Sequence, residues 1–410
     1  MLLDVSREMD LDGIIESESI IAHFQPIVSI KKQKVIGFEG LSRGYCPGTG
    51  KIIPPIDLFN AAAKADRIVE LDHVCRKRIF QTYSRLYGND RDYLLFINVD
   101  VSGLKEKTCE DLLLLEQAHS AGIEPTNVVI EIVESKAGDM SILNKFVQFC
   151  KYYRFLVAVD DVGAGHSNLD RIALIRPDLI KTDRSLIGDI DKNYFKQEIF
   201  KSLVGLSRNI GSLMLAEGIE TEEQAICALQ IGASLFQGFY FGKPKAENYE
   251  TNNGLRENLE NLSMRYSREE AGRLKTLRDK NNRYKQAAQS IAIGLSSINQ
   301  SDFNIHLEKA IQEFQFIDAL YIIDLDGSQL TKTVLNGYHT SRRGSLFKPA
   351  VKGDSHSLKD YYYFLTSTGS KMFTTDPYIS LATGKLCRTI SHYFKHTSHS
   401  RFILCLDIIE

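Results

Sequence analysis

Eight short runs of apolar and β-branched residues recur through the first 245 residues, and they constrain the fold more than any other feature of the chain. The runs begin at residues 23, 35, 94, 128, 155, 179, 213 and 235. From the second run onward, segments with helical apolar spacing separate them. Eight strands with helices between them predict an α/β fold, a (β/α)8 barrel of the triosephosphate isomerase type.

The first connection departs from the ideal barrel. The segment between the first two runs, residues 30–34, is too short for a crossover helix, which needs about a dozen residues. Those two strands are therefore predicted to be antiparallel, which gives a modified barrel with one antiparallel strand.

Polar residues occupy the C-terminal ends of seven runs. They are Glu39, Asn98, Glu131, Asp160 with Asp161, Lys181, Glu217 and Gln237. In a parallel barrel these ends share one rim, where clustered carboxylates repel one another unless something positive neutralises them. Oxygen-only ligands suit Mg²⁺ or Mn²⁺, and the adjacent acids Asp160 and Asp161 suit a site with two ions.

Each of these residues also has a simpler interpretation. A single acid is more often a helix cap or half of a surface ion pair. Lys181 is compatible with a structural salt bridge or with positioning an attacking water. Gln25, before Pro26, ends a strand or belongs to the site, and the residues alone leave both open.

The remainder of the chain changes character. Leu255, Leu259 and Leu262 begin a helical pattern among many charges, which predicts a long, mostly exposed helix with a solvated face rather than a nucleic-acid contact. Alternating runs after residue 298 predict a small antiparallel sheet. We therefore predict a barrel over 1–248, a linker helix over 249–297 and a small α+β domain over 298–410.

Composition excludes several classes of protein. Lys and Arg number 50 against 52 Asp and Glu, so the net charge of −2 recruits neither a nucleic acid polymer nor an anionic membrane. No run approaches the roughly 18 apolar residues of a membrane span, and the start is acidic, which predicts a cytoplasmic protein. The seven cysteines form no CxxC pair, which argues against a disulfide framework or a zinc ribbon.

Sequence blocks in the first 245 residues resemble the EAL domain family of cyclic di-GMP phosphodiesterases. The blocks are FQPI (24–27), EGLSR (39–43), FINVD (96–100), EIVE (131–134), DDVGAGHSNL (160–169), DLIKTD (178–183), AEGIET (216–221) and FQGFYFGKP (236–244). The resemblance implies a metal-dependent hydrolase that cleaves cyclic di-GMP to linear pGpG with two ions, Mg²⁺ or Mn²⁺, and works as a homodimer in signal transduction.

The resemblance also assigns roles to residues. It implies metal ligands at Glu39, Asn98, Glu131, Asp160, Asp161 and Glu217. It implies catalytic roles for Lys181, Glu217 and Glu39, with Lys181 contacting the nucleophilic water, and a loop anchor at Glu134. Residues implied to line or support the dinucleotide site are Gln25, Leu41, Arg43, Asp183, Glu220, Gln237 and Phe239.

Several positions depart from the family pattern. Gly40 replaces a usual Ala, with a small effect expected because both residues are small. Asp100 and Ser234 differ from a common Ser and Asp, and the loop after Asp161 differs at Val162, Ala164, His166 and Asn168. Because this loop supports the metal site in the family, the alternative is a receptor that binds cyclic di-GMP with little or no cleavage and acts on a protein partner.

The C-terminal region resembles the PAS or Cache-like domain of some Bacillus EAL proteins, through residues 362–364, 374–384 and 388–391. Such a domain implies a small ligand held by Tyr363, Asp376, Tyr378 and Arg388. The alternative is that these residues only form turns and pack the sheet.

Overall fold

The computed structural model describes residues 10–46, 50–88, 92–100, 110–133, 140–163, 169–246, 253–337 and 346–409. The chain divides into two compact units, Met1–Ala271 and Gly272–Glu410. The predicted three-part division, with its separate linker, remains a prediction.

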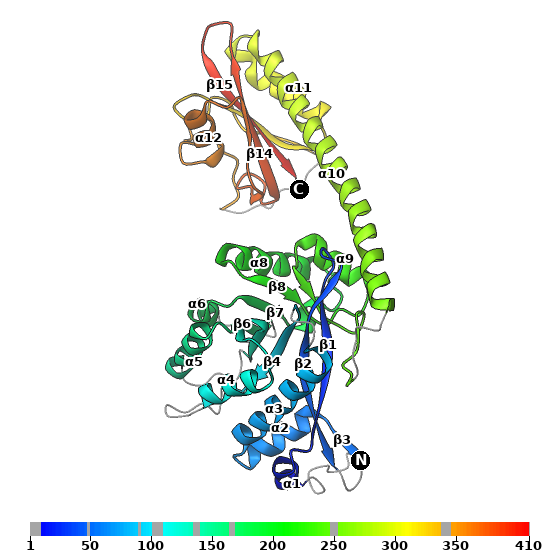
Figure 1. Ribbon diagram of the computed structural model, residues 1–410. Helices are drawn as coiled ribbons and strands as arrows, with labels where there is room; N and C mark the ends of the chain where they lie inside the picture. Colours follow the sequence, from blue (N-terminus) through cyan, green and yellow to red (C-terminus); the bar gives the residue numbers. More distant parts are fainter. Residues whose placement is uncertain are drawn as a thin grey trace, which may run out of the picture. The chain divides into compact units, whose positions relative to one another are not determined.

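The first unit contains a closed barrel of eight strands (Figure 1). They are β1 (Ile20–Ser29), β2 (Lys34–Cys46), β4 (Leu94–Val99), β5 (Val128–Val133), β6 (Leu156–Val162), β7 (Leu179–Thr182), β8 (Leu213–Ala216) and β9 (Leu235–Phe236). β1 runs antiparallel to both of its neighbours, β2 and β9, while the other barrel neighbours are parallel. The predicted barrel with one antiparallel strand is thus confirmed.

Helices flank the barrel strands. They are α1 (Leu11–Glu16), α2 (Pro55–Lys64), α3 (Ile68–Tyr87), α4 (Glu110–Ser120), α5 (Met140–Tyr152), α6 (Leu169–Ile175), α7 (Arg184–Ile187), α8 (Tyr194–Ile210) and α9 (Glu222–Ile231). Helix α8 shows why they form locally: Asn193 caps its N-terminus by accepting two backbone N–H bonds, and Gly211, with a φ of 79°, ends it.

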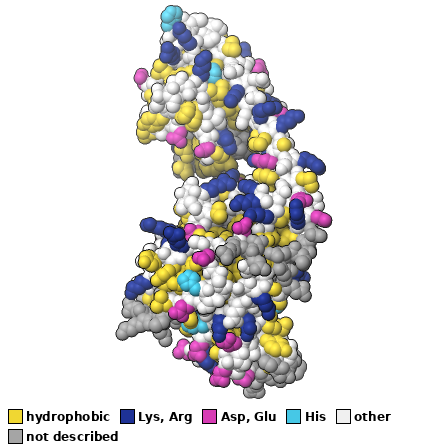
Figure 2. Space-filling model, in the orientation of Figure 1, with side chains coloured by type: hydrophobic (Ala, Val, Ile, Leu, Met, Phe, Trp, Pro, Cys, Tyr) yellow, Lys and Arg dark blue, Asp and Glu magenta, His cyan; other side chains and the backbone are white. Residues whose placement is uncertain are grey.

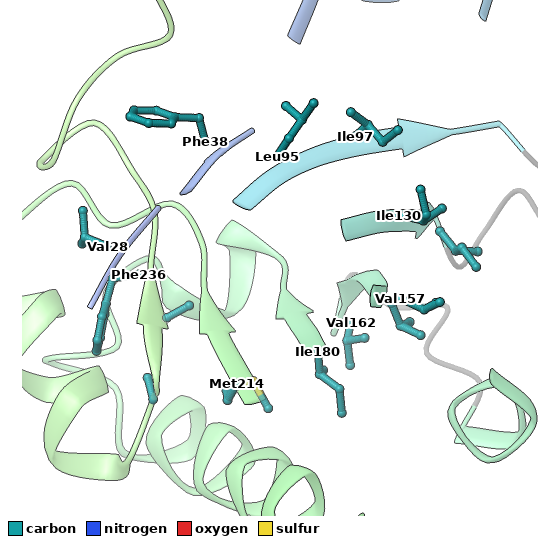
Figure 3. Close-up of a cluster of buried hydrophobic side chains, with 14 of the residues drawn as sticks. Val28, Phe38, Leu95, Ile97, Ile130, Val157, Val162, Ile180, Met214 and Phe236 are labelled. Carbon is teal, nitrogen blue, oxygen red and sulfur yellow. The ribbon is translucent and has the colours of Figure 1, made fainter. Parts of the chain in front are cut away.

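Alternation along the strands builds two apolar layers. Side chains such as Ile97, Ile130, Ile180 and Phe236 belong to the cluster that packs the strands against their helices (Figure 3). Their neighbours in sequence form a separate buried cluster inside the barrel: Ile27, Phe96, Val129, Ala158, Leu179, Leu215 and Leu235. We call this inner layer the apolar floor of the barrel, and the polar residues of the rim lie directly above it.

The second unit contains an antiparallel sheet in the order β11-β10-β15-β14-β12. Its strands are β10 (Ile317–Ile323), β11 (Val334–Leu335), β12 (Met372–Thr374), β13 (Tyr378–Ile379), β14 (Leu386–Lys395) and β15 (Arg401–Ile409). One face packs on α11 (Phe303–Glu313) and the end of α10 (Asn253–Ser296), and the other packs on α12 (Asp360–Thr368). The small sheet domain predicted from the alternating runs is present.

Helix α10 is the long helix expected from the charged segment. Leu255, Leu259 and Leu262 are buried in the core of the first unit, and Ile291 and Leu295 are buried in the core of the second. Most side chains between residues 267 and 286 are exposed. The helix is therefore stabilised by packing at its two ends.

Both signs of charge are spread over the surface seen in Figure 2. In the part of the chain that the structure describes, we find no helix with the length and apolar character needed to cross a membrane.

Candidate active site

The polar residues predicted to share a rim lie one layer above the inner apolar floor. On strands β4 to β9 the floor residue is followed, two positions later, by a polar one: Asn98 after Phe96, for example, and Lys181 after Leu179. Because strand side chains alternate, both residues point into the barrel. On the antiparallel strand β1 the direction reverses, so Gln25 precedes Ile27 and lies opposite Glu39.

Lys181 is the centre of this layer. Its Nζ atom lies 2.6 Å from Glu131 Oε1, 2.6 Å from Glu217 Oε1 and 3.4 Å from Asp160 Oδ1. Glu39 Oε1 is farther away, at 3.8 Å. The Lys181 side chain is 1% exposed, so one buried ammonium group faces four carboxylates from four different strands or strand ends.

Glu39 is held by two amides as well. Asn98 Nδ2 donates to Glu39 Oε1 at 3.0 Å, and Gln237 Nε2 donates to Glu39 Oε2 at 2.5 Å. The same Gln237 amide also donates to Gln25 Oε1 at 3.2 Å. Of the residues predicted to line the dinucleotide site, Gln237 therefore contacts the acidic cluster directly, and Gln25 contacts it through Gln237.

Burial and charge set the ionisation of the cluster. Burial raises the pKa of Glu131 and of Glu217 well above the ordinary value, since the attraction of Lys181 does not offset desolvation and the neighbouring acids. Burial also opposes ionisation of Glu39, but Lys181 and the two amides outweigh it, so the pKa of Glu39 is lowered. Burial opposes the charge of Lys181, yet the surrounding carboxylates keep its pKa well above the ordinary value.

Asp160 and Asp161 adopt an unusual local geometry at the end of β6. The pairing of β6 with β7 is irregular between Val159 and Val162, and Asp161 has a φ of 58°, which a non-glycine residue rarely adopts. The backbone N–H of Asp161 donates to Asp160 Oδ1 at 2.8 Å. Burial and the neighbouring Asp160 raise the pKa of Asp161.

The donor set fits divalent cations in its chemistry. The donors are carboxylate and amide oxygens, and they include the fully buried Glu131, both of whose carboxylate oxygens are withdrawn from solvent. Within the described ranges, no group of three or more Asp, Glu, His or Cys side chains is arranged so that it could hold a metal ion. Here Lys181 balances the negative charge of the carboxylates.

The other predicted site residues lie around this cluster. Leu41 and Arg43 are half-buried on β2, and Arg43 Nη1 donates to the Ser42 carbonyl. Asp183 accepts from the Ser185 N–H at 2.8 Å, while Glu220 is exposed and Phe239 is 56% exposed. Glu134, and the loop residues Ala164, His166 and Asn168, lie outside the described residues.

Sequence reasoning missed a buried ion pair beside the cluster. Arg76 Nε lies 3.1 Å from Asp72 Oδ2 on α3, and both side chains are buried. The pair lines a cavity of about 180 Å³ with Leu41, Asn98 and Asp100. The available signal was the i, i+4 spacing of opposite charges within a helical stretch.

The structure gives a steric reason for a glycine at position 40. A Cβ atom added at Gly40 would lie 2.4 Å from Ile79 Cγ2. The sequence-based expectation that alanine would be nearly equivalent is therefore wrong for this barrel, because α3 packs directly on β2 at this point.

The second unit holds a cavity of about 680 Å³ at the predicted ligand-binding residues. Tyr363, Asp376 and Tyr378 line it, together with Tyr361 and Phe364. Arg388 is not among the lining residues.

Fold and site together define a triosephosphate isomerase type barrel whose rim carries a lysine-centred group of acids. A family model described as "EAL domain" matches residues 8–244, and the chain belongs to the EAL domain family.

Among its relatives is the uncharacterised EAL-domain protein YkuI of Bacillus subtilis, 28% identical over 389 residues and covering 93% of each chain. A crystal structure of YkuI with its substrate c-di-GMP and calcium has a TM-score of 0.80, at 26% identity, over 98% of this chain and 99% of that one.

Two further relatives match a little over half of this chain. The cyclic di-GMP phosphodiesterase RocR of Pseudomonas aeruginosa is 27% identical, over 60% of this chain and 61% of its own. Klebsiella pneumoniae BlrP1, solved with manganese and cyclic di-GMP, is 31% identical with a TM-score of 0.51, over 56% of this chain and 57% of its own.

Proposed function

We propose that this protein is a metal-dependent phosphodiesterase that hydrolyses cyclic di-GMP to linear pGpG and so lowers the level of this second messenger. The observation that carries the proposal is the buried group of acids around Lys181, in which Lys181 Nζ lies 2.6 Å from the fully buried Glu131 and 2.6 Å from Glu217. Family membership and the relatives solved with cyclic di-GMP and a divalent cation support the substrate and the need for metal.

We assign the metal-binding role to Glu39, Asn98, Glu131, Asp160, Asp161 and Glu217. Two ions, Mg²⁺ or Mn²⁺, supply Lewis acidity when bound, which lowers the pKa of a water molecule and stabilises an in-line displacement at phosphorus.

The chain's own residues orient and balance this site. Asn98 and Gln237 fix the two oxygens of Glu39, so they position a ligand before any ion arrives. Lys181 favours the ionised form of Glu39, lies within 2.6 Å of Glu131 and Glu217, and offers N–H groups to an attacking water. The guanidinium of Arg43 suits a substrate phosphate, since its planar fork donates two parallel hydrogen bonds.

The second candidate function is a receptor that binds cyclic di-GMP without cleavage and signals to a protein partner. The altered residues after Asp161 favour it, because loss of loop support would lower ion occupancy without removing a ligand.

We also propose a small ligand in the cavity lined by Tyr363, Asp376 and Tyr378, whose binding α10 would relay to the barrel. The homodimer, the cytoplasmic location and the PAS or Cache-like character of the second unit stay predictions.

The test incubates the full chain with cyclic di-GMP and Mg²⁺, Mn²⁺ or EDTA and separates the nucleotides by chromatography. The proposal predicts pGpG only with a divalent ion, and loss of the product in Glu39→Ala. The exposed Glu257→Ala variant is a matched control that should retain activity. Tight binding of cyclic di-GMP with no product under either ion would reject the hydrolase and support the receptor.

A further inference from the structure

A separate cavity of about 750 Å³ lies in the second unit, at the end of the sheet where β12 stops pairing with β14. Its walls come from the last turns of α10, the end of α12 and residues His392 to Lys395 of β14. It shares no lining residue with the cavity at Tyr378. Its volume is in the range of small-molecule sites, which is roughly 300 to 1,000 Å³.

The charge of this cavity is entirely positive. Lys371, Lys395 and Arg401 line it, and no Asp or Glu does. Within the described ranges, none of the three forms an ion pair with an acid. The cavity therefore holds three cationic groups without a protein counter-charge.

The three cations lie on one face of the sheet. Lys395 is directly opposite Arg401 in the β14–β15 register, and the Tyr393 N–H donates to the Lys371 carbonyl at 2.9 Å. Alternation places Lys371, Lys395 and Arg401 on the face that packs against α12. Like charges directly opposite each other in a sheet destabilise it, so the pair Lys395–Arg401 costs free energy unless an anion offsets it.

His392 lines the same cavity from the opposite face of the sheet, where alternation places it with Phe394, and adds an unsatisfied polar atom. Its Nδ1 atom is buried and lacks a hydrogen-bond partner in the structure. Buried polar atoms are usually paired, so this nitrogen indicates a missing partner. Burial, and then the charge of Lys371, lower the pKa of His392, which is the effect expected where no anion is near.

The rest of the lining mixes polar residues, Gln289, Ser296 and Thr366, with an apolar part. Ala292 and Ile293 of α10, Leu365 of α12 and the rings of Tyr393 and Phe394 contribute to the wall. Ile293 is 71% exposed, so its side chain is accessible within the cavity. The cavity is thus far larger than a bare phosphate requires, and it offers an apolar surface to an organic group.

We propose that this cavity binds a nucleoside di- or triphosphate, with its phosphates at Lys371, Lys395 and Arg401 and its nucleoside against the apolar wall. Lys371, Lys395 and Arg401 are exposed and are therefore accessible to a ligand with several negative charges, and the guanidinium fork of Arg401 matches phosphate oxygens. The apolar part of the lining can pack against an organic group, and the nucleoside of a nucleotide is such a group. This inference does not depend on hydrolysis of cyclic di-GMP by the barrel.

The test measures binding of GTP to the full chain by titration calorimetry, with EDTA present so that divalent ions do not recruit GTP to the barrel acids. Saturable binding is expected, with guanosine and inorganic phosphate each at least ~10-fold weaker. The triple variant Lys371→Gln, Lys395→Gln, Arg401→Gln should weaken GTP binding by at least ~10-fold. The matched control is Lys309→Gln, Lys348→Gln, Lys352→Gln, which removes the same charge from exposed sites outside the cavity and should change the affinity by less than ~2-fold.

Three outcomes would overturn the proposal: no saturable binding of GTP, equal weakening by the two triple variants, or phosphate binding as tightly as GTP. Thermal melts check that the variants are folded. If the cavity triple variant does not fold, Ile293→Asp provides the second test, because this exposed position tolerates a polar residue and a new negative charge there should repel GTP. Unchanged GTP affinity in Ile293→Asp would then reject the site.

Discussion

Lys181 provides the positive charge that faces the carboxylates at the barrel rim. Four carboxylates lie within 4 Å of a single ammonium group that is 1% exposed. Removing one partner of a buried ion pair leaves an uncompensated buried charge, which typically costs about 3 to 5 kcal/mol. We expect Lys181→Met in EDTA to lose stability on this scale, measured by urea denaturation of the full chain.

Mn²⁺ should restore part of the stability of Lys181→Met, because a divalent cation can replace the missing positive charge. Lys192→Met, at an exposed position, is the control and should be nearly neutral. Equal stability of Lys181→Met and wild type in EDTA would show that Lys181 does not balance these acids.

Gly40 tests the packing between β2 and α3. Because a Cβ at this position would lie 2.4 Å from Ile79 Cγ2, Gly40→Ala should destabilise the first unit by about 1 to 3 kcal/mol. Removing the obstructing methyl in Gly40→Ala with Ile79→Ala should make the two effects non-additive in a double-mutant cycle of urea unfolding. Strict additivity would mean that the two residues are not in conflict.

The polar residues of the rim were predictable because strand alternation fixes which side chains enter the barrel. The hydrogen-bond partners of these polar residues could not be predicted from the sequence. The sequence pattern placed Gln237 at the rim and the family resemblance implied a role at the dinucleotide site, but neither identified the hydrogen bonds that its amide donates to Glu39 and Gln25. Such contacts depend on the stagger between strands that are distant in the chain, and no local pattern encodes that stagger.

At the level of elements, the barrel strands were predicted from short apolar runs and the antiparallel pair from the length of one connection. β3 (Lys51–Ile53) was not predicted, since three residues carry too little alternation to be recognised. Two segments predicted as longer strands end early: β8 stops at Ala216 and β9 at Phe236. Gly218 and Gly238 follow them with positive φ angles, which turn the chain away from the sheet.

Helix α10 contains one glycine whose replacement has a clear expected effect. Gly272 lies where the two units meet along the chain, and a Cβ added there has no heavy atom within 4 Å. Gly272→Ala should therefore stabilise the helix by about 0.5 to 1 kcal/mol, because alanine loses less backbone entropy on folding. Hydrogen exchange of the amides from residue 268 to 280 should slow by a few-fold, and faster exchange would contradict a continuous helix at this point.

At the level of the molecule, Asp407 makes the stability of the second unit depend on pH. Burial raises the pKa of Asp407 to about 7, even though the Thr389 hydroxyl donates to its carboxylate. Between the unfolded pKa of about 4 and the folded pKa, the folded unit holds a proton that the unfolded chain has released. Asp407 therefore lowers stability progressively as pH rises through this window, and its full penalty is present above pH 7.

Asp407→Asn removes the ionisation and keeps an acceptor for Thr389. The stability of the variant relative to wild type should rise from pH 4 to pH 8 by up to about 4 kcal/mol, the value of three pKa units. Urea denaturation across this range measures the difference, and titrations shared by both proteins cancel. A difference that stays constant with pH would show that Asp407 keeps an ordinary pKa.

We propose that the buried acids around Lys181 form the metal site at which cyclic di-GMP is cleaved. The most direct test compares the rate of pGpG formation by wild type and Glu131→Gln as Mn²⁺ is titrated, with cyclic di-GMP binding measured alongside. Glu131 suits this comparison because it is fully buried and glutamine keeps its shape. The account predicts a saturable Mn²⁺ dependence in wild type and a loss of at least ~100-fold in Glu131→Gln, with binding retained. Undiminished pGpG formation by Glu131→Gln would contradict it.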